Sequence, residues 1–347
     1  MYTPRRARLA ATALALSLIA SAALAQAPTK MRFVLDWRFE GPASLFLMGN
    51  TKGYYKAEGL DVTIDSGTGS GATVTRVASG VYDMGFADLA AMIEFLANNR
   101  DNPGARMQAV MMVYESTPAA VIALKKSNIT KPSDLQGKTL GAPVFDAGRK
   151  AFPIFAKANR LDTGTIKWQA MDPPLRETML VRGDVDAITG FSFTSLLNLN
   201  ARGIKDADVV MLKYPEHGVR LYGNVIIASE KFIKENPKAV AGFLRAFTKG
   251  ARDVIRDPDG AIDTVLKQRD PLIDAALEKR RLKMALADAV ATKEARAGNF
   301  GLIDEARVRA NAAQVAEAFN LKQLPELDKI INTSFMPSAA ERQIFGK

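Results

Sequence analysis

The sequence predicts an α/β protein built from two lobes, and three observations support this. The chain has 347 residues, which is more than one hydrophobic core usually serves. Segments with the apolar period of strands alternate with segments with the period of helices, a pattern typical of a largely parallel sheet covered on both faces. After Asn236 the alternation gives way to long helices. We therefore expect two sheets followed by a helical region.

The first half of this pattern begins with a strand, a helix and a second strand. The strand over 60–65 alternates apolar and polar side chains with period two, and Gly59 ends the helix before it. The predicted strands of this part cover 31–36, 60–65, 82–87 and 107–113, and the predicted helices cover 43–55, 72–79 and 89–97.

A second series of strands and helices follows. The predicted strands cover 119–124, 139–142, 166–169, 187–189 and 209–212, and the helices cover 147–158 and 175–181. From Asn236 the chain reads as long helices, because Asn236 can cap a helix, Pro237 suits its first turn, and apolar residues then recur at three-to-four spacing. Further helices are predicted over 271–287 and 304–319.

The first residues have the layout of a secretory signal peptide. Arg5, Arg6 and Arg8 precede a small, apolar run over 9–24, and Ala23-Leu24-Ala25 has the small residues of a cleavage site. We assign 1–25 to a signal peptide that is cleaved near Ala25, and we expect the product in the periplasm. The Arg5-Arg6 pair leaves open whether the general or the twin-arginine route exports it.

Composition excludes several classes of protein. The chain contains no cysteine, so it has no disulfide, no thiolate ligand and no cysteine to carry a lipid anchor. Its net charge is +10, but no Lys/Arg block interleaves with aromatic residues, so we expect no nucleic-acid partner. His217 is the single histidine, without the spacing of a metal site or a catalytic triad. We expect no metal, no cofactor and no enzymatic activity.

Six segments carry a resemblance to a known family. Asp36-Trp37 lies at the end of the first predicted strand, and the other segments are 52–62, the glycine-rich turn 67–71, 81–88, 131–138 and 183–187. In this order they resemble the nitrate, sulfonate and taurine type of ABC transporter solute-binding proteins. The Asp-Trp pair looks most like the branch that binds thiamine-pyrimidine precursors.

The resemblance implies a periplasmic binding protein fold of type II, with two Rossmann-like lobes joined by two hinge crossings. We place the crossings near 114–119 and 215–222. Lobe 1 then comprises 26–116 and, with the C-terminal helices, 219–347, and lobe 2 comprises 117–218. The resemblance also implies a monomer that binds a small molecule between its lobes and delivers it to the membrane permease of an ABC importer.

Open α/β sheets bind ligands beyond the carboxyl ends of their strands, so residues at predicted strand ends are candidates for the site. The candidates are Asp36, Trp37, Gly67, Gly69, Ser70 and Asp88 in lobe 1, Phe145, Asp146, Phe191 and Ser192 in lobe 2, and Tyr222 and Asn224 after the second crossing.

Each candidate also has a purely structural interpretation. Trp37 could stack on a planar ligand or pack in the core, and Asp36 could accept a hydrogen bond from an exocyclic amine or cap a turn. The glycine-rich loop at 67–71 could direct N–H groups at an anion or form a simple turn. Phe191 could face Trp37 across the closed cleft, and Tyr222 could belong to the pocket or to the hinge.

The ligand stays open between two chemistries. A formylaminopyrimidine or hydroxymethylpyrimidine would use Asp36 and aromatic faces, whereas a sulfonate, taurine, nitrate or an aromatic acid would use the glycine-rich loop and an arginine such as Arg76 or Arg149. Two other roles are considered. The resemblance extends to thiamine-pyrimidine synthases, which use a histidine and a cysteine-rich stretch with iron that this chain lacks, and a sensor partner would need the same liganded surface as an importer.

Overall fold

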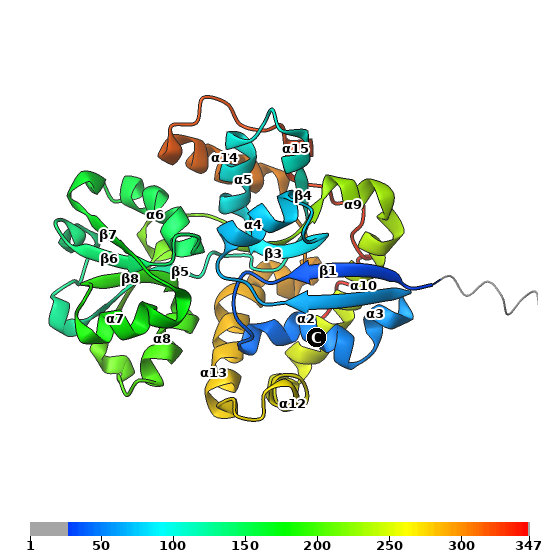
Figure 1. The fold of residues 1–347 in the computed structure, drawn as a ribbon, viewed down its shortest axis with the longest axis horizontal. Helices are drawn as coiled ribbons and strands as arrows, with labels where there is room; N and C mark the ends of the chain where they lie inside the picture. The colour runs from blue at the N-terminus through cyan, green and yellow to red at the C-terminus, as the bar shows by residue number, and fades with distance from the viewer. Residues whose placement is uncertain (1–26, 346–347) are drawn as a thin grey trace, which may run out of the picture.

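The computed structural model describes residues 27–345, so the predicted signal peptide and its cleavage site lie outside the described residues. In this part of the chain the strands form two five-stranded sheets, one in each of two lobes that lie side by side (Figure 1). The chain passes from the first sheet to the second between Met112 and Ala119 and returns between Lys213 and Asn224. Two segments therefore connect the lobes.

The sheet of lobe 1 has the strand order β2-β1-β3-β10-β4. Its strands are β1 (Thr29–Val34), β2 (Leu60–Asp65), β3 (Met84–Asp88), β4 (Met107–Met112) and β10 (Asn224–Ser229). Strands β1, β2 and β3 run parallel, and β10 lies antiparallel between β3 and β4. The sequence analysis placed no strand at β10, although its six residues are all buried at the centre of the sheet.

The sheet of lobe 2 has the order β7-β6-β8-β5-β9. Its strands are β5 (Ala119–Leu124), β6 (Thr139–Ala142), β7 (Lys167–Ala170), β8 (Ala187–Phe191) and β9 (Val209–Lys213). Strand β5 runs antiparallel to both of its neighbours. Each lobe thus has one reversed strand, and in each lobe it is the strand that directly follows a crossing. The sheets are largely parallel, as predicted.

Helices cover both sheets. In lobe 1 they are α2 (Ser44–Thr51), α3 (Tyr54–Ala57), α4 (Ser70–Ala78), α5 (Leu89–Asn98), α9 (Glu230–Glu235) and α10 (Pro237–Arg256), and in lobe 2 α6 (Ala147–Ala158), α7 (Arg176–Arg182) and α8 (Ser192–Asn200). The start of α10 at Pro237 confirms the prediction. Its apolar face packs on the lobe 1 core, where the ring of Phe243 lies 4.9 Å from that of Phe33.

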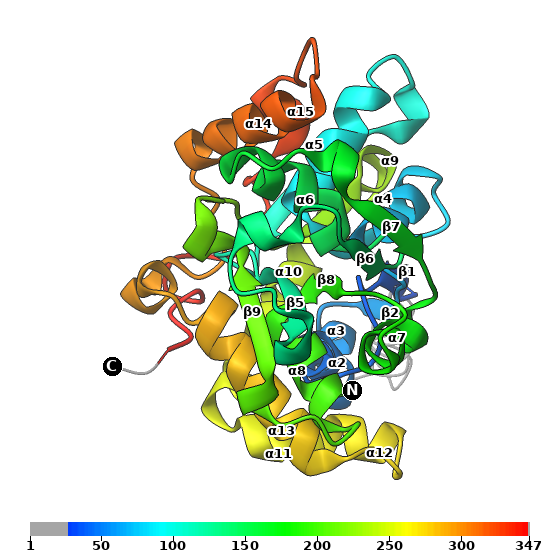
Figure 2. The ribbon, with the colours of Figure 1, turned by 90° about the vertical axis from the view of Figure 1, so that its left-hand side faces the viewer.

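The C-terminal region contacts both lobes. It contains α11 (Pro258–Ala261), α12 (Lys267–Arg269), α13 (Ala275–Ala285), α14 (Glu305–Phe319) and α15 (Leu327–Ile330), with π-helical turns at Ile262–Leu266, Leu286–Val290 and Ala295–Asn299. Helix α13 packs on lobe 1 and also on α8 of lobe 2, and α14 packs on both α5 and α6 (Figures 1 and 2). Within the described residues, no helix combines the length and apolar character that crossing a membrane requires.

Candidate functional site

The loops that follow β1 and β2 of lobe 1 meet the loops that follow β6 and β8 of lobe 2, and two neighbouring hollows lie between them. Their cavity volumes are about 20 Å³ and about 30 Å³. Asp36, Trp37, Phe191 and Thr194 line both hollows, Gly69, Ser70, Asp146, Ala147 and Arg176 line the first, and Leu35, Arg38, Glu40, Pro42, Ala43, Phe46, Phe86, Tyr114 and Phe193 line the second. Both lobes therefore contribute to one cleft.

Asp36 is the first polar side chain after β1 and is held by a residue from far along the chain. The side-chain amide of Asn224, the first residue of β10, donates a 2.7 Å hydrogen bond to Asp36 Oδ2. Burial raises the pKa of Asp36 from its ordinary value of 3.8 to about 7, and the Asn224 hydrogen bond opposes this shift only in part. Asp36 is thus an acceptor whose charge the cleft does not balance.

The glycine-rich loop is fastened to the Asp36-Trp37 backbone. Gly67 N–H donates to the carbonyl of Trp37 at 2.8 Å, and Gly69 N–H donates to the carbonyl of Asp36 at 2.7 Å. A Cβ at Gly67 would lie 2.1 Å from the carbonyl oxygen of Leu35, so this close approach requires glycine. These two N–H groups are used within the lobe, which is contrary to the interpretation that the loop directs them at an anion.

The same loop also touches the other lobe. Gly71 N–H donates to the carbonyl of Phe145 at 3.1 Å, and a Cβ at Gly69, which has φ of +132°, would lie 2.3 Å from that carbonyl oxygen. The side chain of Phe145 is 47% exposed and lines neither hollow. Phe145 thus contributes its backbone to the contact between lobes, and the structure does not place its ring in the cleft.

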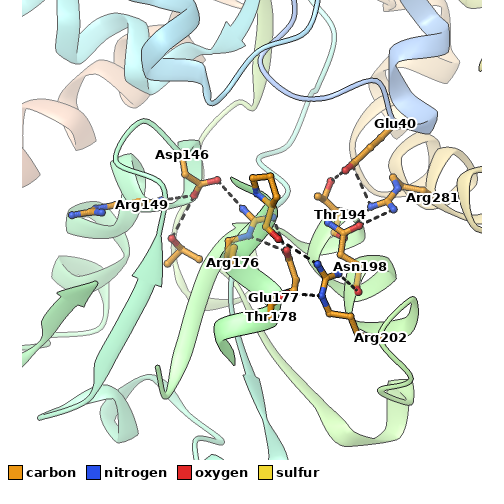
Figure 3. Close-up of polar contacts among 12 residues, drawn as sticks. Glu40, Asp146, Arg149, Arg176, Glu177, Thr178, Thr194, Asn198, Arg202 and Arg281 are labelled. Carbon is orange, nitrogen blue, oxygen red and sulfur yellow. Dashed lines mark hydrogen bonds and ion pairs between the residues drawn. The ribbon is translucent and has the colours of Figure 1, made fainter. Parts of the chain in front are cut away.

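Arg176 lines the first hollow from lobe 2, and Figure 3 shows its polar contacts. Its buried guanidinium bonds Asp146 at 3.1 Å and Glu177 at 2.9 Å. The guanidinium also lies over the ring of Trp37, and its central carbon, Cζ, is 4.9 Å from the ring centroid. The predicted partner of Trp37 across the cleft was Phe191, which lines the same hollow, but the structure places Arg176 over the ring.

The position of Arg176 depends on a glycine in β8. A Cβ at Gly190 would lie 2.6 Å from Arg176 Nη1, so any side chain there would displace the guanidinium from its present position. Asp146 caps the N-terminus of α6, since it accepts from Arg149 N–H at 2.9 Å, and it accepts a weaker bond from Thr189. Burial raises the pKa of Asp146 even though the Arg176 charge lowers it.

The second hollow has an aromatic wall and an acidic one. Tyr114 lies edge-on to Phe191 and Phe193, with ring centroids 6.2 Å and 6.3 Å apart. On the acidic side, Glu40 Oε2 accepts from Thr194 Oγ1 at 3.3 Å and lies 3.2 Å from Arg281. Burial raises the pKa of Glu40, although the charge of Arg281 opposes this.

Carboxylates outnumber guanidinium groups around the two hollows. Asp36, Glu40, Asp146, Glu177 and Glu278 are the acidic groups of this network, whereas Arg176 and Arg281 are its two buried bases. Buried charges are costly unless they are paired. The closed cleft is therefore electrostatically suited to a group that donates hydrogen bonds or carries positive charge.

Comparison with known proteins decides the family. The model of the family described as NMT1/THI5 like matches residues 43–261, which is more than half of the chain. The chain belongs to this family. The predicted resemblance is confirmed, although the Asp36-Trp37 pair lies just before the matched segment.

Relatives in the NMT1/THI5-like family include binding proteins and enzymes. The riboflavin-binding protein RibY of Chloroflexus aurantiacus is 26% identical over 70% of this chain and 67% of its own. The formylaminopyrimidine-binding protein of Halalkalibacterium halodurans is 26% identical over 71% of this chain and 74% of its own. The 4-amino-5-hydroxymethyl-2-methylpyrimidine phosphate synthase THI5 of Saccharomyces cerevisiae is 27% identical over 66% of this chain and 68% of its own.

Solved structures confirm the predicted fold. The alkanesulfonate-binding protein SsuA of Xanthomonas axonopodis pv. citri aligns with a TM-score of 0.67 and 17% identity, over 87% of this chain and 96% of its own. A Candida albicans protein with the generic periplasmic binding protein structural fold aligns with a TM-score of 0.65 and 15% identity, over 89% and 98%. The chain has the two-lobed periplasmic binding protein fold.

Besides Gly67, Phe145 and Asn224, three further predicted residues line neither hollow. Asp88 caps α5 by accepting from Ala91 N–H at 3.0 Å, and burial raises its pKa to about 7. Ser192 is buried, and its N–H donates to the carbonyl of Pro118. Tyr222 lies under Arg307 of α14, 3.8 Å from the guanidinium carbon to its ring centroid. None of the three lines a hollow, so their place in the ligand site stays a prediction.

Sequence reasoning missed several residues of the cleft. Glu40, Tyr114, Arg176, Thr194 and Arg281 carry no motif that marks them. Arg76 and Arg149 were the expected basic groups, but Arg149 instead donates to the carbonyl of Ala142 and stacks on Trp168. No local signal distinguishes Arg176, the first residue of α7, from a solvated arginine on a helix.

Four buried polar atoms at the cleft have no hydrogen-bond partner among the described residues. They are Trp37 Nε1, Ser70 Oγ, Asn224 Oδ1 and Arg176 Nη2, and the last of these forms an ion pair with Glu177 at 2.8 Å. Trp37 and Ser70 line the first hollow, and Asn224 is bonded to Asp36. Because buried polar atoms are normally paired, these donors and this acceptor are available to a ligand. Over residues 27–345, no cluster of His, Cys, Asp and Glu is suited to a metal ion, and His217 packs edge-on against Phe155.

Proposed function

We propose that this chain is the periplasmic solute-binding component of an ABC importer, and that it binds a flat, amine-bearing heterocycle of the thiamine-pyrimidine precursor class. The observation that carries the proposal is the chemistry of the first hollow. An aromatic face, unpaired donors and a carboxylate without a balancing cation come together there. The family membership and the formylaminopyrimidine-binding relative are consistent with this ligand.

The polar atoms of the hollow complement an aminopyrimidine. Asp36 and Asn224 Oδ1 would accept hydrogen bonds from an exocyclic amine. Trp37 Nε1 and Ser70 Oγ would donate to ring nitrogens or to a formyl oxygen. The face of Trp37 would stack on the ring, which requires Arg176 to yield or to slide to the ring edge.

An anionic ligand finds less support in this cleft. The Arg176 guanidinium is already bonded to Asp146 and Glu177, and the N–H groups of Gly67 and Gly69 bond the backbone of their own lobe. An anion would also face the uncompensated Asp36 carboxylate. This charge argument favours a ligand that is not anionic.

Binding must be coupled to movement, because each hollow has room for only one or two water molecules. A six-membered ring enters only if the lobes separate. The two segments that connect the lobes, 113–118 and 214–223, are where such a rotation would occur. Capture and release by two lobes need no reacting group, which supports a binding role over the synthase activity of some relatives.

The test is a ligand panel on the mature chain, from residue 26. Native mass spectrometry of protein purified from cells would identify a retained ligand, and a thermal-shift series would compare formylaminopyrimidine, hydroxymethylpyrimidine, riboflavin, taurine, an alkanesulfonate and nitrate. Stabilisation by a pyrimidine that Trp37→Ala abolishes is the expected result. Stabilisation by a sulfonate or nitrate alone would overturn the proposed ligand class, and periplasmic uptake of labelled pyrimidine, lost on deletion of the chain, would test the importer role.

A further inference from the structure

Helix α13 is anchored to lobe 1 by tight backbone packing. Glu278 Oε2 accepts a 2.5 Å hydrogen bond from the N–H of Gly41, which lies in the loop after Trp37. A Cβ at Gly41 would lie 2.5 Å from the carbonyl oxygen of Glu278 and 2.9 Å from the N–H nitrogen of Leu282. Helix α13 thus packs directly on the backbone of the lobe 1 loop, and we expect the two to move together when the lobes separate.

Two neighbouring arginines on α13, Arg280 and Arg281, contact lobe 2, and Figure 3 shows the contacts of Arg281. Arg281 is buried and donates to the carbonyl of Thr194 at 2.9 Å and to Asn198 Oδ1 at 3.0 Å, both on α8. Arg280 is exposed and donates to Asn200 Oδ1 at 2.9 Å and to Asp206 at 2.5 Å. These contacts join lobe 1 to lobe 2 without passing through either connecting segment.

The ion-pair partners of Arg281 both lie on its own side. Glu278 bonds it twice at 3.0 Å from the same helix, and Glu40, from the lobe 1 loop, lies 3.2 Å away. Its lobe 2 acceptors are a carbonyl and an amide, which are neutral. Opening the cleft would break two hydrogen bonds but would leave the charge of Arg281 paired. The contact can therefore be made and broken without stranding a buried ion.

We propose that Arg280 and Arg281 form a clasp between α13 and lobe 2 that stabilises the closed arrangement and so sets ligand affinity without contacting the ligand. The inference about affinity rests on the proposed function, whereas the inference about closure does not. The clasp also positions the cleft wall, because the Thr194 whose carbonyl it holds lines both hollows and bonds Glu40. Arg281 is a positioning residue in this scheme.

Two variants test the clasp with little risk to folding: one changes a lobe 2 residue, Asn198, and the other changes the exposed arginine, Arg280. Asn198→Ala removes one acceptor of Arg281 and leaves its carboxylate partners in place. Arg280→Ala removes the exposed half of the clasp. The matched control is Asn50→Ala, because the Asn50 amide makes one hydrogen bond, to the carbonyl of Val62, entirely within lobe 1.

Closure is measured directly by spin-label distances. The chain contains no cysteine, so Asp61→Cys in lobe 1 and Lys167→Cys in lobe 2, both exposed, give one label on each lobe. Without ligand, we expect the parent protein to have a closed population. In Asn198→Ala the ratio of closed to open protein should be about tenfold lower, because one hydrogen bond to a charged group is lost. Arg280→Ala should shift the ratio less, and Asn50→Ala not at all.

Ligand kinetics give the second readout. With formylaminopyrimidine as the probe, we expect Asn198→Ala to raise the dissociation rate about tenfold while the association rate and the melting temperature stay near those of the parent. A general loss of structure would instead lower the melting temperature. The proposed clasp is wrong if the ligand-free parent has no closed population, or if Asn198→Ala leaves the closed population unchanged. If the pyrimidine does not bind at all, the proposed function fails, and the ligand-free distances alone decide the clasp.

Discussion

Replacing Asp36 by asparagine should stabilise the ligand-free protein at alkaline pH while it weakens binding of an amine-bearing ligand. The substitution keeps the size of the side chain and an oxygen that can accept from Asn224, but it removes the charge. Asp36 is half-buried at the base of the cleft, and no cation in its own contacts balances it. The native sequence therefore retains a carboxylate that costs stability, as residues at binding sites often do.

The magnitude follows from the pKa of Asp36, which burial raises from 3.8 to about 7. At about 1.36 kcal/mol per pKa unit, a shift of roughly three units lowers the free energy of unfolding at pH 8 by at most about 4 kcal/mol. The folded state holds a proton that the unfolded state gives up between these two pKa values. The free energy of unfolding should therefore fall as the pH rises from about 4 to about 7, and Asp36→Asn should remove its share of that fall.

Urea unfolding at pH 5 and pH 8 measures this directly. The parent should lose more stability between the two pH values than Asp36→Asn does. Burial also raises the pKa of Asp88 and of Glu115 to about 7, but both remain in the variant, so the difference isolates Asp36. The control is Asp134→Asn, because hydrogen bonds from the backbone at Thr130 lower the pKa of that carboxyl, so it is ionised in both states between pH 5 and pH 8 and its removal should leave the pH dependence unchanged. Equal pH dependence in Asp36→Asn and the parent would refute the reasoning.

Three further substitutions test the cleft. Trp37→Ala should weaken formylaminopyrimidine binding about tenfold or more in calorimetry, the range for losing one base–aromatic stack, and an unchanged affinity would remove Trp37 from the site. Gly69→Ala should block closure, since its Cβ would meet the Phe145 carbonyl oxygen at 2.3 Å. With ligand, scattering should show a larger radius for Gly69→Ala than for Gly80→Ala, because Gly80 also has a positive φ, of +73° against +132°, but nothing lies within 4 Å of its Cβ. Equal radii would contradict this. Arg176→Met should cost about 3–5 kcal/mol of unfolding free energy because it strands Asp146 and Glu177, whereas a cost below about 1 kcal/mol would mean that these carboxyls are neutral.

Much of the fold could be predicted from local patterns. The strand at 119–124, the helix at 147–158 and the start of α10 at Pro237 fall where the sequence pattern placed them, although the Asn236 side chain makes no capping hydrogen bond. The strand β10 was missed, because its apolar run is too short for periodicity to distinguish from a buried loop next to a crossing. Its antiparallel place between β3 and β4 depends on the chain returning from lobe 2, which no local pattern encodes.

The site divides in the same way. Asp36 and Trp37 could be found because a polar or aromatic residue at the carboxyl end of a strand in an α/β sheet faces the cleft. Arg176 and Arg281 could not, because arginine on a helix is normally a solvated residue, and nothing local marks these two as buried. Their burial depends on partners from distant segments, such as Gly190 for Arg176 and α8 for Arg281.

The sequence by itself determined the alternation of strands and helices, the family resemblance and the strand-end residues of the first lobe, because each of these is written in short-range spacing. Only the tertiary structure decided which charges meet across the cleft, which glycine amides are already used, and how α13 joins the two lobes. Those properties arise where segments far apart in the chain are brought within hydrogen-bonding distance, and there the burial and pairing of charge, rather than local propensity, set the energies.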